Sequence, residues 1–160
     1  MKLSILLLLT GSAAGVCLGQ SDPNTMPNTY AQKLVTDAMA KHPELVILAM
    51  HAKSPEDPNY PIIGWGGPTG GKVRIGKKAD EDDMRVINTG KENLEVNSTG
   101  NHFEVELPLQ DAHKKTIGAL GVVFNYKAGD DKAVLKKKAE EIRDELRDQI
   151  PSADKLSEAR

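Results

Sequence analysis

Residues 103–126 read FEVELPLQDAHKKTIGALGVVFNY, and this stretch decides the fold. Every second residue of Phe103–Leu109 is apolar, and the positions between them hold Glu104, Glu106 and Pro108. This alternation is typical of a strand that turns one face to a core and the other to water. Because proline has no amide hydrogen to donate to a neighbouring strand, Pro108 predicts that the strand ends there or lies near the edge of a sheet.

The second half of the same stretch is Thr116–Tyr126 (TIGALGVVFNY), which is apolar along most of its length. We expect it to form the next strand, with Gln110–Lys115 as the turn between the two. Gly118 and Gly121 interrupt the run, and glycine inside a strand is typical of a place where another group approaches the backbone closely. The stretch therefore predicts an antiparallel hairpin.

Three shorter segments upstream are further strand candidates. Glu44–His51 (ELVILAMH) is a continuous apolar run, which suits a central strand covered on both faces. Pro61–Trp65 and Asn93–Asn97 are brief strands bounded by turn residues. With the hairpin, they predict five strands in one sheet.

Helical patterns lie before, between and after these strands. Tyr30–Lys41 carries apolar residues at the i, i+3, i+4, i+7 spacing of an amphipathic helix, and Asp131–Ile150 carries a second such stripe. Ala79–Asn88 predicts a short middle helix, because Asp80 can cap its start and Gly90 can end it. The order α-β-β-α-β-β-β-α predicts an α+β domain. We expect an antiparallel five-stranded sheet with a long N-terminal helix, a short middle helix and a C-terminal helix.

The first residues have the layout of a secretory signal peptide. Lys2 precedes the apolar run Leu3–Leu9, and small residues follow. Cys17-Leu18-Gly19 fits a cleavage site, so we expect a signal peptide over 1–19. Lipid attachment at Cys17 and an uncleaved anchor remain as alternatives. Cleavage would leave a chain without any thiol, in the periplasm or outside the cell.

The rest of the chain divides simply. Residues 20–29 are polar with two prolines and predict a flexible leader, 30–151 a single domain, and 152–160 a polar tail. The 160 residues are 39% hydrophobic and 28% charged, which is ordinary for a soluble globule. The 21 basic and 23 acidic residues give no electrostatic case for binding nucleic acid. A single cysteine excludes a disulfide framework and a cysteine-rich zinc site.

Two phrases resemble a known family. Arg74–Lys91, which contains IGKKADEDDMRVINTGK, and Phe103–Tyr126, with its V-x-L-P-L and I-G-x-L-G-V strands, resemble the extracytoplasmic PAS-like sensor domains called single Cache domains. The resemblance covers roughly Tyr30 to Gln149. It implies a sensor-type, ligand-binding domain, here without the membrane helix and signalling module that usually follow. Ala112-His113-Lys114 stands in the hairpin turn where a glycine is common in that family.

Motifs for phosphate and metal are incomplete. Gly66–Lys72 (GGPTGGK) has the spacing of a phosphate loop, but Val73 stands where magnesium binding needs Ser or Thr. A weaker anion site on the basic residues of Gly66–Lys78 remains open. The acidic run Asp80–Asp83 lacks the alternate ligands, glycine and distal glutamate of a calcium loop, and predicts a helix start instead. We therefore expect no metal and no cofactor.

Catalytic patterns are equally sparse. The four histidines show no zinc-binding spacing, and no G-x-S-x-G motif occurs. Glu104 and Glu106 share a strand face and could serve acid–base chemistry, but polar-outward alternation predicts them as well. Asn97-Ser98-Thr99 is a glycosylation sequon, relevant only in a eukaryotic cell. We expect no catalytic residues.

The sequence thus favours a secreted or periplasmic domain that binds a small organic molecule, with an anion as one option. The pocket would lie between the sheet and Gly66–Lys78. The candidate ligand-binding residues are His51, Tyr60, Trp65, Arg74, Lys77 and Arg85. The alternative is a protein-interaction or dimerisation module that uses the first or the last helix and needs no pocket. An unrecognised enzyme is the third reading.

Overall fold

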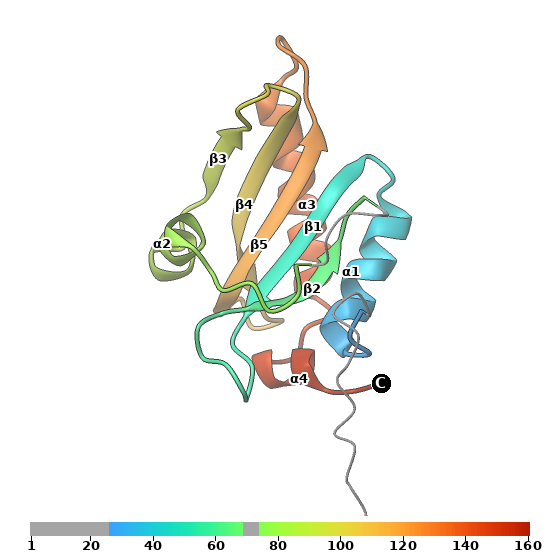
Figure 1. Ribbon diagram of the computed structural model, residues 1–160, viewed down its shortest axis with the longest axis vertical. Coiled ribbons are helices and arrows are strands. Elements are labelled where there is room, and N and C mark those ends of the chain that lie inside the picture. The colour runs from blue at the N-terminus through green and yellow to red at the C-terminus, as the bar shows by residue number, and fades with distance from the viewer. Residues whose placement is uncertain (1–25, 69–73) are drawn as a thin grey trace, which may run out of the picture.

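The computed structural model describes residues 26–68 and 74–160, and these form an α+β domain with four helices and a five-stranded antiparallel sheet (Figure 1). The α+β class and the five-stranded antiparallel sheet predicted from the sequence are confirmed. The expected signal peptide and residues 20–25 of the leader lie outside the described residues. The elements are α1 (Tyr30–Lys41), β1 (Leu45–Ala52), β2 (Ile62–Gly66), α2 (Glu81–Thr89), β3 (Asn93–Val96), β4 (His102–Gln110), β5 (Thr116–Asn125), α3 (Lys132–Arg147) and α4 (Ala153–Ser157).

The strand order across the sheet is β2-β1-β5-β4-β3, and every neighbouring pair is antiparallel. The predicted hairpin is the β4–β5 pair, and the apolar run of β1 lies inside the sheet between β2 and β5. β3 pairs only with Phe103–Glu106 of β4. Pro108 therefore lies past the end of β3, where one side of β4 has no strand neighbour, as its missing amide hydrogen requires.

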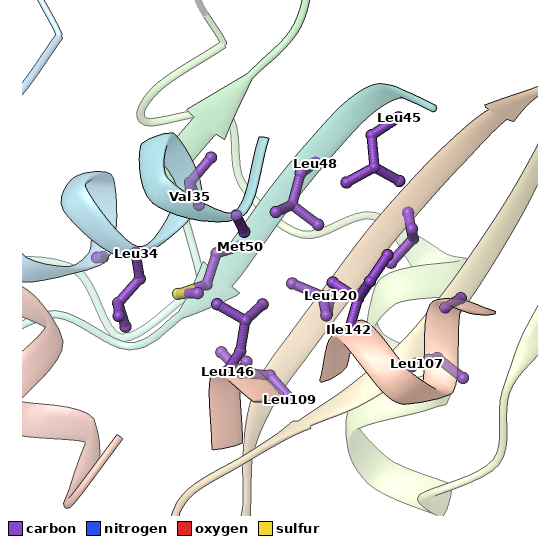
Figure 2. Packing of buried hydrophobic residues seen from close by; sticks show 14 of the residues in the cluster. Leu34, Val35, Leu45, Leu48, Met50, Leu107, Leu109, Leu120, Ile142 and Leu146 are labelled. Carbon is purple, nitrogen blue, oxygen red and sulfur yellow. The ribbon is translucent and has the colours of Figure 1, made fainter. Parts of the chain in front are cut away.

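One face of the sheet is covered by α1 and α3, and the hydrophobic core lies between them and the strands. Figure 2 shows Leu34 and Val35 of α1 and Ile142 and Leu146 of α3 gathered over the strands. The strand residues that they meet are Leu48, Met50, Leu107, Leu109 and Leu120. We call this the covered face, and the opposite one the open face.

Glycines set two close approaches in this architecture. A Cβ on Gly64 would lie 2.8 Å from Cγ2 of Val35, so the glycine lets α1 pack directly on β2. A Cβ on Gly118 would lie 1.8 Å from the carbonyl oxygen of His51 on β1. The close backbone approach predicted at Gly118 is thus present between β5 and β1.

The β4–β5 turn contains no glycine and is held by hydrogen bonds to the side chain of Asp111. Lys114 adopts a left-handed conformation with φ of 64°, which costs a non-glycine residue energy. The Asp111 carboxylate accepts hydrogen bonds from the amides of His113 and Lys115 at 2.9 and 3.0 Å, and this holds the turn in place. The strained Lys114 is thus supported by a buried aspartate.

The C-terminal segment, expected to be a polar tail, instead contains α4. Leu156 is fully buried in the core, and Thr29 forms an antiparallel bridge with Ala159. The described end of the leader and the end of the chain are therefore paired beside α1. Among the described residues, no helix combines the length and the apolar character needed to cross a bilayer.

Candidate functional site

The open face of the sheet carries a row of side chains that crosses all five strands. The pairing register places Trp65, Ala49, Gly121, Glu106 and Asn93 directly opposite one another, on β2, β1, β5, β4 and β3 in turn. Directly opposite residues share a face. The two smallest residues stand in the middle of the row, so the backbone of β1 and β5 forms a shallow floor between Trp65 and Glu106.

Two flanking rows complete this face. On one side, register places four residues in line: Glu95, Glu104, Val123 and Ile47. On the other side stand Pro108, Ala119, His51 and Ile62. A Cβ on Gly121 would lie 3.2 Å from Oε1 of Glu104, so the Glu104 carboxylate leans over the floor that this glycine leaves open.

A cavity of about 280 Å³ lies over these rows. Its walls come from the open face, from the start of α2 and from the turn that precedes α2. The residues that line it are Ile47, Ala49, His51, Ile62, Trp65, Arg74, Lys77, Asp80, Asp82, Asp83, Asn93, Glu95, Glu104, Glu106 and Val123. A second hollow of about 200 Å³ shares Glu95 and Glu104 with it, which extends the depression along the sheet.

Trp65 forms one end of the cavity, and its backbone is fixed by an unusual contact for an edge strand. The side chain of Gln32 on α1 donates to the Trp65 carbonyl oxygen at 2.9 Å and accepts from the Trp65 amide at 3.0 Å. This pairing occupies the backbone groups that an edge strand would otherwise leave free. The guanidinium of Arg74 lies 5.9 Å from the Trp65 ring centroid, within cation–π range.

Arg74 and Lys77 stand on a short turn that is pinned to β2. The amide of Ile62 donates to the Lys77 carbonyl oxygen at 2.8 Å, and the amide of Gly76 donates back to the Ile62 carbonyl oxygen at 2.9 Å. Gly76 has φ of 83°, a left-handed conformation that glycine adopts without cost. The turn therefore fixes where both basic side chains start.

The start of α2 brings aspartates over the sheet. Asp80 and Asp83 form a capping box: Asp80 Oδ1 accepts from the Asp83 amide at 3.3 Å, and Asp83 Oδ2 accepts from the Asp80 amide at 2.8 Å. Both carboxylates also gain from the positive end of the helix dipole. The helix start that the sequence predicted at Asp80 is confirmed, and it leaves Asp83 Oδ1 directed to the sheet.

His51 meets that aspartate from β1. Its Nδ1 lies 2.9 Å from the carbonyl oxygen of Tyr60, which can only accept, so Nδ1 carries a hydrogen. Its Nε2 lies 3.6 Å from Asp83 Oδ1. Both side chains are almost entirely buried.

Glu106 is the most deeply buried acid of the cavity, with 5% of its surface exposed. Desolvation, with a hydrogen bond and like charge from Asp83, raises the pKa of Glu106 to about 9. Desolvation also raises the pKa of Glu104, with Asp83 and Glu95 adding like charge. At neutral pH Glu106 is protonated, and its hydroxyl can donate to Asp83. The nearby acids thus favour the neutral form of Glu106, because like charges at short range oppose its ionisation.

The structure brings together four of the six residues predicted to bind a ligand. His51, Trp65, Arg74 and Lys77 line the cavity. The Tyr60 ring is not part of the lining and lies under the ammonium of Lys53, 5.1 Å from its centroid, although the Tyr60 carbonyl holds His51.

Arg85 also points elsewhere. It pairs with Asp82 at 2.9 Å and donates to Asn93 Oδ1 at 2.9 Å, and it is absent from the cavity lining. The acidic lining residues Asp83, Glu95, Glu104 and Glu106 were not among the predicted contacts. The signal that could have found Glu104 and Glu106 was present, since their alternation with apolar residues already placed them together on the face opposite the core.

The remaining motifs find structural roles or lie outside the described residues. The phosphate-loop pattern over Gly66–Lys72 falls largely on residues 69–73, which are not described. Asp80 and Asp83 cap α2, which accounts for the acidic run. Within 26–68 and 74–160, no three His, Cys, Asp or Glu side chains are arranged to hold a metal ion.

Asn97 of the sequon forms part of the β3–β4 turn. Its Nδ2 donates to Thr99 Oγ1 at 2.9 Å and to Asn101 Oδ1 at 2.8 Å. Its Oδ1 accepts from the amides of Asn101 and His102, at 3.0 Å each. The side chain therefore closes the turn.

Comparison with known proteins gives no family for this chain. No protein-family model matches it, and no curated protein matches it significantly. The site must therefore be interpreted from its own geometry.

Proposed function

We propose that this protein is a sensor-type binding domain, of the PAS/Cache kind that its sequence resembles, and that it holds a small organic ligand in the open-face cavity without catalysing a reaction. The observation that carries the proposal is the cavity itself. One side of the sheet is sealed by two helices, whereas the other is floored with the smallest available residues and rimmed with polar groups.

The lining has the mixture that ligand pockets use. Trp65 supplies an aromatic wall, Ala49 and Gly121 a flat floor, and His51, Arg74 and Glu106 convergent polar groups. Each is fixed by its own contacts: Trp65 by Gln32, His51 by Tyr60, and Glu106 by its place inside β4. A preformed arrangement of this kind lowers the entropic cost of binding.

A cleaved signal peptide would place this domain in the periplasm or outside the cell, where it would report ligand to a partner. The interaction-module alternative uses the first or the last long helix, with an exposed apolar stripe as its contact. Ala31, Leu34, Val35 and Ala38 of α1 are instead buried in the core. The stripe of α3 is buried there as well, at Ala139, Ile142 and Leu146. Because neither described helix exposes its stripe, the binding function is favoured over the interaction module.

A thermal-shift screen tests the proposal directly. The chain would be heated with panels of organic acids, organic amines, neutral alcohols and nucleotides. A ligand present at 100 times its dissociation constant adds about 2.7 kcal/mol to the free energy of unfolding, which raises Tm by roughly 5–10 °C at this chain length.

A cavity-filling variant decides where the ligand binds. Ala49→Leu would fill the floor, and we expect it to abolish the shift. Ala128→Leu makes the same chemical change at an exposed residue of the β5–α3 loop and should leave the shift intact. A flat response to every panel, or equal shifts in both variants, would refute binding in this cavity.

A further inference from the structure

We propose that the ligand of this cavity is an organic cation, with an ammonium head seated at Glu104 and Glu106 and an apolar body that lies over Gly121 and Ala49 toward Trp65. This inference rests on the proposed binding function and names the chemical class of its ligand.

The first support is the balance of charge. Six carboxylates line the cavity, against Arg74, Lys77 and His51. Two of the six pair with a basic side chain, Asp80 with Lys77 at 3.2 Å and Asp82 with Arg85 at 2.9 Å, and a third, Asp83, lies 3.6 Å from His51 Nε2. Glu95, Glu104 and Glu106 form no salt bridge with any described residue. The acids without a described cationic partner are thus gathered on β3 and β4.

The second support is the position of these three residues in the sheet. Glu95 and Glu104 stand directly opposite each other on β3 and β4, a like-charge pair that destabilises a sheet. Glu106 is 95% covered, and its nearest charged neighbour is another acid, Asp83. Burying a carboxyl without a cation is unfavourable. An incoming ammonium would relieve both of these costs, whereas an anion would increase them.

The third support is the shape of the floor. Glu106, Gly121, Ala49 and Trp65 stand in one row across four strands. Neighbouring strands are about 4.8 Å apart, so the row runs roughly 14 Å from the acid to the indole. Side chains at Gly121 or Ala49 larger than these would block the row. The arrangement suits an elongated molecule with its charge at one end and an apolar or aromatic group at the other.

Proton exchange follows from the same geometry. The acids that face Glu106 are Asp83 and Asp80 at the start of α2 and Glu104 on its own strand, with Glu95 of β3 nearby. The basic groups of the cavity near it are His51 on β1 and Lys77 on the turn before α2. Because desolvation and the acids hold a proton on Glu106 at neutral pH, an ammonium that binds its carboxylate must release that proton. Binding should therefore strengthen as the pH rises toward 9, while the amine itself stays charged.

Three probes of equal shape separate the charge classes: 4-phenylbutylammonium, 4-phenylbutanol and 5-phenylpentanoate, titrated calorimetrically into the full chain. We expect the ammonium to bind at least tenfold more tightly than the alcohol or the carboxylate. Glu104→Gln should weaken it at least tenfold. Glu56→Gln, in the exposed β1–β2 loop, is the matched control and should change the affinity less than twofold.

Buffers with different ionisation heats report the proton. About one proton should leave per ammonium bound at pH 7.5, and none in Glu106→Gln, whose side chain cannot titrate. A preference for the carboxylate or the alcohol that Ala49→Leu abolishes would overturn the cation while the proposed binding function stands. Binding of calcium chloride in place of the ammonium would also overturn it. Failure of every probe, together with a flat thermal-shift screen, would refute both proposals.

Discussion

The two faces of the sheet differ in polarity and burial, although the same strands form both. On β4, Phe103, Val105 and Leu107 are sealed under the helices, whereas the alternate residues Glu104 and Glu106 face the cavity. The covered face is filled by α1 and α3, whereas the described residues that reach over the cavity on the open face come from the start of α2 and the turn before it. The difference between the faces lies in what packs against them.

Alternate residues of each strand therefore serve different purposes: one set stabilises the fold, and the other lines the cavity. Covered-face side chains remove apolar area from water and stabilise the fold. Open-face side chains at the cavity retain charge, small size or partial exposure, all of which weaken a core. A shift of one residue in register would exchange the two sets, so the pairing register itself protects the site.

The largest expected effect compares two adjacent residues of β1. Leu48 is fully buried on the covered face, and Leu48→Ala should lower the free energy of unfolding by about 2–5 kcal/mol, since it leaves a void between packed helices and sheet. Ile47 is half-buried at the cavity, and Ile47→Ala should cost about 1.5 kcal/mol or less, because solvent can fill the space it leaves. Urea unfolding of both variants measures the difference. Equal losses would show that the open face is packed as tightly as the core.

The sequence predicted the strands well, because alternating or continuous apolar residues indicate which segments enter a sheet. Glu44–His51 was expected to be covered on both faces, however, and this was wrong, since β1 turns Ile47 and His51 to the cavity. Phe103–Leu109 and Glu44–His51 gave their strands, and the α2 cap at Asp80 was readable from local chemistry. Gly118 signalled the close approach of β1. These predictions depend on neighbours within a few residues, where sequence patterns are informative.

The acidic character of the site could not be read in the same way. Glu104 and Glu106 look solvated when β4 is considered alone, but in the fold Glu106 is buried and Asp83 approaches it from α2. Arg85 was predicted to bind ligand, but its guanidinium is occupied by Asp82 and Asn93. The burial of Leu156 was not predicted, because a single apolar residue in a polar segment shows no periodicity. Such contacts depend on tertiary structure, which spacing does not encode.

The second prediction concerns the pH dependence that the open face imposes on the fold. The pKa of Glu106 is about 9 in the folded chain, against 4.5 for an ordinary glutamate. Between these values the folded state holds the extra proton, so the free energy of unfolding should fall as the pH rises, by at most about 1.4 kcal/mol per unit for one proton. Glu106→Gln keeps a donor toward Asp83 but cannot titrate.

We therefore expect Glu106→Gln to match the natural chain near pH 5 and to exceed its stability at pH 8. Denaturant unfolding across pH 5–9 measures the two curves, and Glu56→Gln provides the control for a surface glutamate. Parallel curves for the natural chain and Glu106→Gln would mean that the pKa of Glu106 is not raised in the folded chain. The buried members of the covered-face cluster are all hydrophobic, and the tyrosines packed against it ordinarily titrate near pH 10, so the comparison isolates the open face.

The smallest expected effect tests α2, the helix whose start reaches over the open face. Asp80→Ala removes the acceptor for the Asp83 amide and the partner of Lys77, and loss of such a cap costs about 1 kcal/mol. Asp80→Asn keeps an acceptor at that position and should lose less. Fraying the first turn of α2 would also move Asp83 away from His51 and Glu106, so faster hydrogen exchange of the Asp83 amide should accompany the loss. If the stability falls while that amide stays protected, Asp80 acts through Lys77 and not through the helix start, and the acids over the cavity are held by their contacts with the sheet.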